Sequence, residues 1–203
     1  CPMRCQFCHN PDTWKMQDGE LKTTDELLKT ALRYKSYWKD KGGITVSGGE
    51  PLMQMDFLID LFKKAKEKEE PFFGKLQELL KYTDMLMLDI KHIDDEQHKI
   101  LTGQSNKNIL EFARYLSDIK KPIWIRHVLV PERSDKDEYL ERLHDFIETL
   151  DNVERVEVLP YHTLGAYKWK ELGYDYKLEG IDPPTPERIE NANRILETAK
   201  YLK

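Results

Sequence analysis

The sequence has no cysteine after residue 8: all three cysteines lie in the first eight of its 203 residues. Three thiols cannot form a framework of several disulfides, and neighbours at this spacing make poor intramolecular disulfides. This excludes a disulfide-stabilised secreted scaffold and favours a reducing compartment, so we expect a cytoplasmic protein.

Long hydrophobic runs and an excess of positive charge are also missing. No apolar stretch approaches the roughly 20 residues of a membrane-spanning helix. The formal net charge is −5, whereas surfaces that bind nucleic acids are usually basic. We therefore expect neither a membrane nor a nucleic acid as a partner. The sequence has no repeat or linker, so we expect one domain over residues 1–203 and a monomer.

Helical and strand patterns alternate along the chain. The helical patterns cover 23–42, 56–69, 74–83, 108–119, 137–150 and 186–201, and the strand patterns cover 44–49, 85–91, 123–130 and 153–160. Nearly continuous apolar strands separated by helices indicate an α/β fold with a parallel sheet or barrel. Only "PFFG" separates the second and third helices, where a strand should intervene. A helical hairpin and a strand missing from the sequence are both open explanations.

The segment "CPMRCQFC" places Cys1, Cys5 and Cys8 four and three residues apart. Thiolates at this spacing can converge on one metal centre. A closed zinc site needs four ligands, and His9 could be the fourth. An iron–sulfur cube with three cysteine ligands would instead leave one iron open to another molecule. The alternative without a metal is three unrelated thiols.

Polar residues also follow the predicted strands. "VSGGEP" ends one predicted strand with Gly48, Gly49 and Glu50. Glycines let a ligand approach the backbone, and a carboxylate can accept hydrogen bonds from an ammonium group. A plain tight turn would explain the glycines equally well. Other strand-end or strand residues are Asp89, Ile90, Lys91, Arg126 and His162. In a parallel sheet such positions gather at one edge, where they would suit an anionic ligand. Separately, each is more often part of a surface salt bridge.

The longer pattern "CPMRCQFCHNPDTW" resembles the radical S-adenosylmethionine (SAM) enzymes, with Phe7 as the aromatic residue before the last cysteine. "SGGEP" resembles their glycine-rich motif. "MLDIKH", "WIRHVLVP" and "LPYHTLGAYKW" are similar to the pyruvate formate-lyase activating enzymes, and the similarity runs to Pro184. The resemblance implies a (β/α)6-type partial barrel.

The same resemblance implies the chemistry. Cys1, Cys5 and Cys8 would hold a [4Fe-4S] cluster whose open iron binds SAM, and the 5′-deoxyadenosyl radical would oxidise one glycine of pyruvate formate-lyase. A low-potential donor such as flavodoxin or ferredoxin would supply the electron. The implied cofactor-binding residues are Phe7, Cys8, His9, Gly48, Gly49, Glu50, Asp89, Ile90, Lys91, Arg126 and His162. The absence of further cysteines favours the formate-lyase type over activases with additional cluster domains.

The sequence also departs from this family. Members carry a strand and a "DGPG"-type segment before the first cysteine, and a strand with an Asp-Thr-x-Gly motif that contributes cofactor and monovalent-cation contacts. We expect residues to be missing before Cys1 and around Glu70–Pro71. The other functions considered are an activase of another glycyl-radical enzyme such as anaerobic ribonucleotide reductase, a zinc-binding structural module and an iron–sulfur electron carrier.

Overall fold

The computed structural model describes residues 1–15, 19–38, 42–66 and 75–202. The chain divides into two compact units. The first contains Cys1–Pro2 and Asp12–Asp84, and the second contains Met3–Pro11 and Met85–Lys203. The single domain expected from the sequence stays a prediction.

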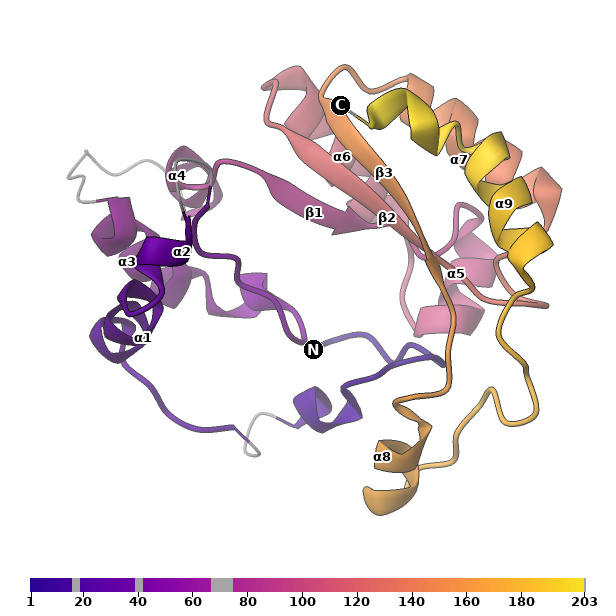
Figure 1. The fold of residues 1–203 in the computed structure, drawn as a ribbon, viewed down its shortest axis with the longest axis horizontal. Coiled ribbons are helices and arrows are strands. Elements are labelled where there is room, and N and C mark those ends of the chain that lie inside the picture. The colour runs from indigo at the N-terminus through magenta and orange to yellow at the C-terminus, as the bar shows by residue number, and fades with distance from the viewer. Residues whose placement is uncertain (16–18, 39–41, 67–74, 203) are drawn as a thin grey trace. The chain divides into compact units, whose positions relative to one another are not determined.

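The first unit is helical in its described residues (Figure 1). It comprises η1 (Pro11–Trp14, which begins in the second unit), α1 (Thr24–Leu32), α2 (Lys35–Trp38), η3 (Pro51–Gln54), α3 (Met55–Lys66) and α4 (Lys75–Tyr82). Thr23 and Glu26 form the predicted capping box at the start of α1. Helix α3 packs on α1 and α4, and its apolar face supplies Leu58 and Ile59 to a small core with Leu79.

Two expectations for this unit need correction. The predicted helix over 23–42 is interrupted after Leu32, and α2 is a separate short helix. The predicted strand over 44–49 is wrong, because residues 44–47 have no regular secondary structure and residues 48–49 form a bend. A strand needs a ladder partner, and β1 to β3 are the strands of the described chain, where they pair only with one another. The junction at Glu70–Pro71 lies outside the described residues.

The second unit is built on a parallel sheet of three strands in the order β1-β2-β3 (Figure 1). The strands are β1 (Leu86–Asp89), β2 (Ile123–Leu129) and β3 (Val153–Pro160). The helices are α5 (Asp95–Thr102), α6 (Lys107–Asp118), α7 (Asp137–Glu148), α8 (Ala166–Glu171) and α9 (Pro186–Ile195), followed by η4 (Thr198–Tyr201). The α/β fold with a partial parallel sheet is therefore confirmed.

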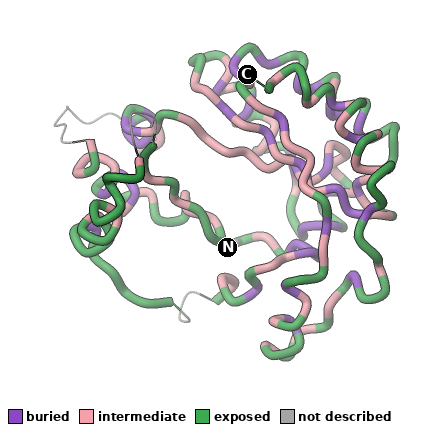
Figure 2. Tube along the Cα trace, viewed as in Figure 1, coloured by how far each residue is buried: buried purple, intermediate pink, exposed green. Residues whose placement is uncertain are grey.

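The sheet of the second unit is stabilised by burial of its side chains and by helices packed on it. Residues of β2 alternate between buried and half-buried, and Figure 2 shows both classes along the sheet. Helices α7 and α9 pack together, and α9 and η4 contact β3. Thr185 caps α9 and Pro186 is its first residue, as the sequence predicts. In the described part of the chain, no helix combines the length and hydrophobicity needed to cross a bilayer.

Three histidines are buried in the second unit: His92, His98 and His127. Burial lowers the pKa of each, that of His92 to about 4. They are neutral in the folded protein and take up protons on unfolding once the pH falls below their unfolded pKa of about 6.5. The unfolded state then binds more protons, so the fold loses stability as the pH falls.

We therefore expect the free energy of unfolding to decrease between pH 7 and pH 5, with a slope of up to about 1.4 kcal/mol per pH unit for each histidine. Urea unfolding at several pH values measures it. The His98→Gln variant should show a slope smaller by one histidine's contribution. A slope equal to that of the wild type would contradict the assignment of His98.

Candidate functional site

The residues predicted from the sequence fall into two groups, one in each unit. The first unit holds Cys1, Gly48, Gly49 and Glu50, and the second holds Cys5, Phe7, Cys8, His9, Asp89, Ile90, Lys91, Arg126 and His162.

The glycine turn lies against Cys1 in the first unit. Gly48 has a φ of 131°, a conformation that favours glycine. A Cβ on Gly49 would come within 3.1 Å of the side chains of Cys1 and Thr13, which is a tight contact, so a larger residue here would require these side chains to move slightly. Glu50 Oε1 accepts from the Leu52 amide at 3.0 Å, which orients the carboxylate and leaves it further acceptor capacity.

The other two cysteines share one tight turn in the second unit. The Cys8 amide donates to the Cys5 carbonyl at 3.0 Å. The turn is fixed to the end of α5, because the amides of Arg4 and Gln6 donate to Thr102 and Leu101 at 2.7 and 2.9 Å. Cys5 and Phe7 are buried in a core with Leu101 and Tyr161. Helix α5, which the sequence patterns did not predict, therefore supports this turn.

The thiols fit a metal or cluster chemically. None of the three cysteines, which all lie in the described part of the chain, is in a disulfide. Burial raises the pKa of Cys5 to about 11, and the nearby charge of Lys91 acts in the opposite direction. A buried thiol of this kind loses its proton when a cation takes its place, as in thiolate ligation of zinc or iron.

The end of β1 and the middle of β2 bring three predicted residues together. Asp89 and Arg126 are paired in register, and Arg126 Nε donates to Asp89 Oδ1 at 2.7 Å. Lys91 Nζ donates to Asp89 Oδ2 at 2.8 Å and lies 6.0 Å from the ring centre of Phe7. Burial raises the pKa of Asp89, but Lys91 and Arg126 outweigh it and hold the pKa below its usual value. Arg126 thus has the partner that a charge in an apolar strand requires.

His9 and His162 also come together. Their rings stack with centroids 4.1 Å apart, and His9 Nε2 lies 3.2 Å from the His162 carbonyl. Burial and the neighbouring His9 lower the pKa of His162. Ile90 is fully buried, and its carbonyl lies 2.8 Å from His127 Nδ1.

Two residues of this site were missed in the sequence. Trp169 Nε1 donates to the Cys8 carbonyl at 2.8 Å, and Gly165 lies against the Cα of His9. Both belong to "LPYHTLGAYKW", in which only His162 was predicted to act. That stretch was the available signal, but sequence spacing does not show which of its residues return to the cysteine turn.

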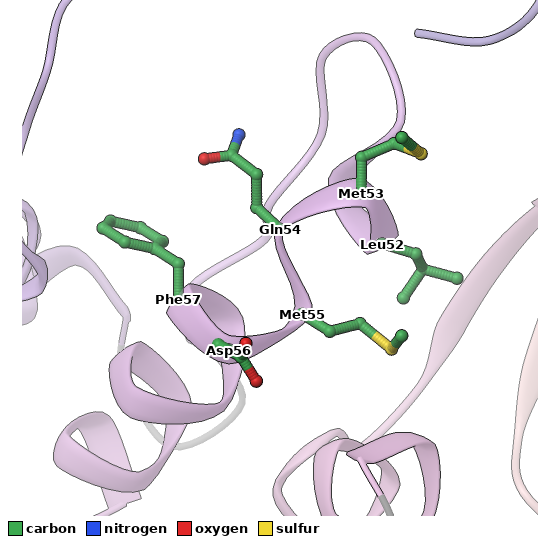
Figure 3. A pocket seen from close by; sticks show the side chains of 6 residues that line it. All are labelled: Leu52, Met53, Gln54, Met55, Asp56 and Phe57. Atoms are coloured by element: carbon green, nitrogen blue, oxygen red, sulfur yellow. The ribbon is translucent and has the colours of Figure 1, made fainter.

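A pocket in the first unit is formed by consecutive residues of η3 and α3 (Figure 3): Leu52, Met53, Gln54, Met55, Asp56 and Phe57. Figure 3 shows Leu52 and Met55 on one side of this segment and Gln54 and Phe57 on the other. None of these residues was predicted to bind a cofactor, so the site rests on the turns and strand ends above.

Comparison with known proteins identifies the family. A model of the radical SAM superfamily matches residues 1–147. The chain belongs to the radical SAM superfamily. Proteins named pyruvate formate-lyase-activating enzyme are similar to this radical SAM enzyme over nearly its whole length. The one from Streptococcus mutans is 52% identical over 99% of this chain and 83% of its own, and the one from Listeria monocytogenes is 49% identical over 99% and 88%.

Solved structures agree on the fold of this radical SAM enzyme. A domain of pyruvate-formate lyase-activating enzyme from Bacteroides vulgatus has a TM-score of 0.62 at 22% identity, covering 78% of this chain and 94% of that one. A radical SAM methyltransferase from Sphaerobacter thermophilus has a TM-score of 0.66 at 17% identity, covering 95% and 59%. The Streptococcus mutans alignment runs over 218 residues, more than the 203 of this chain. That relative therefore contains residues without a counterpart here.

Proposed function

We propose that this radical SAM enzyme activates pyruvate formate-lyase by forming a glycyl radical on it. The observation that carries the proposal is the 52% identity to an enzyme of that name over 99% of this chain. When bound, a reduced [4Fe-4S] cluster would supply one electron to SAM, whose sulfonium S–C bond would break, and the carbon radical so formed would remove one hydrogen atom from a glycine of the partner. Methionine, 5′-deoxyadenosine and the glycyl radical are the products.

The chain's residues have distinct roles in this proposal. Cys1, Cys5 and Cys8 hold the cluster, and three thiolates leave one iron for SAM. Gly48, Gly49 and Glu50 receive the ammonium group of SAM. Phe7 and His9 flank its adenine, with His9 held in place by its stack on His162.

The charged side chains of Asp89, Lys91 and Arg126 form one group in the second unit. Asp89 neutralises part of Lys91 and Arg126, so this group carries a net positive charge. A carboxylate such as that of SAM is stabilised by such charges, and we assign it to Lys91. The buried ring of His127 holds the carbonyl of Ile90, which links Asp89 to Lys91.

The proposal extends to the cell and to other partners. The enzyme acts as a monomer in the cytoplasm, takes electrons from a flavodoxin or ferredoxin, and binds a monovalent cation beside SAM. Three cysteines outside any disulfide support a reducing compartment.

Anaerobic reconstitution with iron and sulfide tests the function. The reduced protein should release methionine from SAM, and it should produce a glycyl-radical signal in electron paramagnetic resonance (EPR) when pyruvate formate-lyase is added. A signal on anaerobic ribonucleotide reductase alone would reassign the partner. Stoichiometric zinc without SAM cleavage after reconstitution would refute the proposal in favour of a zinc module.

Replacing Lys91 with alanine should weaken SAM binding about tenfold or more, because a charged hydrogen bond to the carboxylate is lost. Iron content should stay at the wild-type level. Equilibrium binding of SAM to the reconstituted protein measures the change. Lys99→Ala is the matched control, since the Lys99 ammonium forms ion pairs with Asp95 and Glu96 of its own helix, α5. Equal SAM affinity in Lys91→Ala and wild type would remove Lys91 from the site.

A further inference from the structure

The segment around α8 holds the cysteine turn through side chains. Trp169 Nε1 donates to the Cys8 carbonyl at 2.8 Å, and Lys168 Nζ donates to Asn10 Oδ1 at 3.1 Å. On its other side the turn is fixed by backbone hydrogen bonds to α5. The turn that carries two of the proposed cluster ligands is therefore held from two directions, and Trp169 contacts one of those ligands, Cys8, directly.

Trp169 is itself held rigidly. Its side chain is buried, with 3% of the residue exposed. Its ring meets Tyr176 edge-on at 5.3 Å, and the Tyr176 hydroxyl lies 2.7 Å from that of Tyr161. Tyr161 is buried in the same core as Cys5 and Phe7. A buried donor whose ring packs against Tyr176 loses little conformational freedom when it binds the carbonyl, which favours a stable hydrogen bond.

We propose that Trp169 is a positioning residue that fixes the backbone of Cys8 and thereby keeps its thiol oriented for the cluster. This rests on the proposed function only for the identity of the bound group. The indole acts through the Cys8 carbonyl and touches no reacting atom. Hydrogen bonds around ligating residues orient metal ligands in this way in many sites.

Two substitutions separate the hydrogen bond from packing. Trp169→Phe keeps an aromatic ring and removes the donor. Trp169→His loses the six-membered ring, but its Nε2 follows the same bonds from Cβ as the indole Nε1 and can donate in its place. If the hydrogen bond matters, histidine should rescue and phenylalanine should not. If bulk alone matters, the order should reverse.

The first readout needs no cluster. Hydrogen exchange of the Cys8 amide in the cluster-free protein should be about fivefold faster in Trp169→Phe, the effect of losing one hydrogen bond, and less than about twofold faster in Trp169→His. The amide of Ile125, deep in β2, corrects for global unfolding. Trp124→Phe, on β2 beside Arg155, is the matched control and should leave Cys8 exchange unchanged.

The second readout uses the reconstituted protein. Iron release to a chelator should be faster in Trp169→Phe by a similar factor and close to the wild-type rate in Trp169→His. Equal exchange and equal iron release in Trp169→Phe and wild type would overturn the proposal, as would rescue by phenylalanine rather than histidine. A wild-type protein that binds its cluster but does not activate pyruvate formate-lyase would refute the proposed function and leave the role of Trp169 standing.

Discussion

The Cys5→Ala variant is expected to bind no stable cluster and to release no methionine from SAM. The chain has three cysteines in 203 residues, and a [4Fe-4S] cluster with three thiolate ligands already has one open iron. Removal of Cys5 would leave two ligands for four irons. Iron and sulfide analysis after anaerobic reconstitution, together with a methionine-release assay, measures the loss.

The fold should survive this change. Cys5 is buried and its pKa of about 11 makes it a neutral thiol in the cluster-free protein. Alanine therefore removes one small apolar group, at a cost of roughly 1 kcal/mol. Met3→Ala is a suitable control, because Met3 packs on the same core and also carries sulfur. Wild-type iron content in Cys5→Ala would show that Cys5 is not a ligand.

The sequence predicts the second unit well because its signals are local. Strand β2 reads as an apolar run and pairs on both edges, and Thr185 with Pro186 marks the start of α9. Helices α5 and α8 were missed. Their sequences are strongly polar or short, and helix α8 has only six residues. Segment 44–49 shows the limit of local reasoning, because an apolar run becomes a strand only where a neighbouring strand pairs with it.

In the candidate site, too, the contacts between neighbouring strands could be predicted from the sequence and those between distant segments could not. Asp89 and Lys91 could be placed at one edge of the sheet because they end and follow β1, whereas Arg126 joins them from within β2 through its register pairing with Asp89. The contacts of Trp169 with Cys8 and of Gly165 with His9 join residues more than 150 positions apart. Nothing in residue spacing specifies such pairs, since they depend on how the chain after β3 returns to the cysteine turn.

The Gly165→Ala variant should lose both stability and activity, although one methyl group is the only change. A Cβ at this position would lie 2.6 Å from the Cα and 2.9 Å from the Cδ2 of His9. Atoms this close must move apart, and a backbone atom cannot yield as a flexible side chain can. The φ of −93° at Gly165 is open to alanine, so the effect comes from this contact alone.

The displaced groups are those that His9 holds in place. A shift of His9 separates its ring from His162, now 4.1 Å away between centroids, and moves the residue next to Cys8. Overpacking should lower the free energy of unfolding by about 1–3 kcal/mol. Misplacement on the scale of 1 Å should slow SAM cleavage by up to about 100-fold.

Gly43→Ala is the control, because a Cβ at Gly43 meets nothing within 4 Å in the described structure. Its free energy of unfolding should stay within about 0.5 kcal/mol of the wild-type value. Thermal unfolding measures the loss of stability, and methionine release measures the loss of activity. Wild-type values of both for Gly165→Ala would show that the close contact between Gly165 and His9 does not matter.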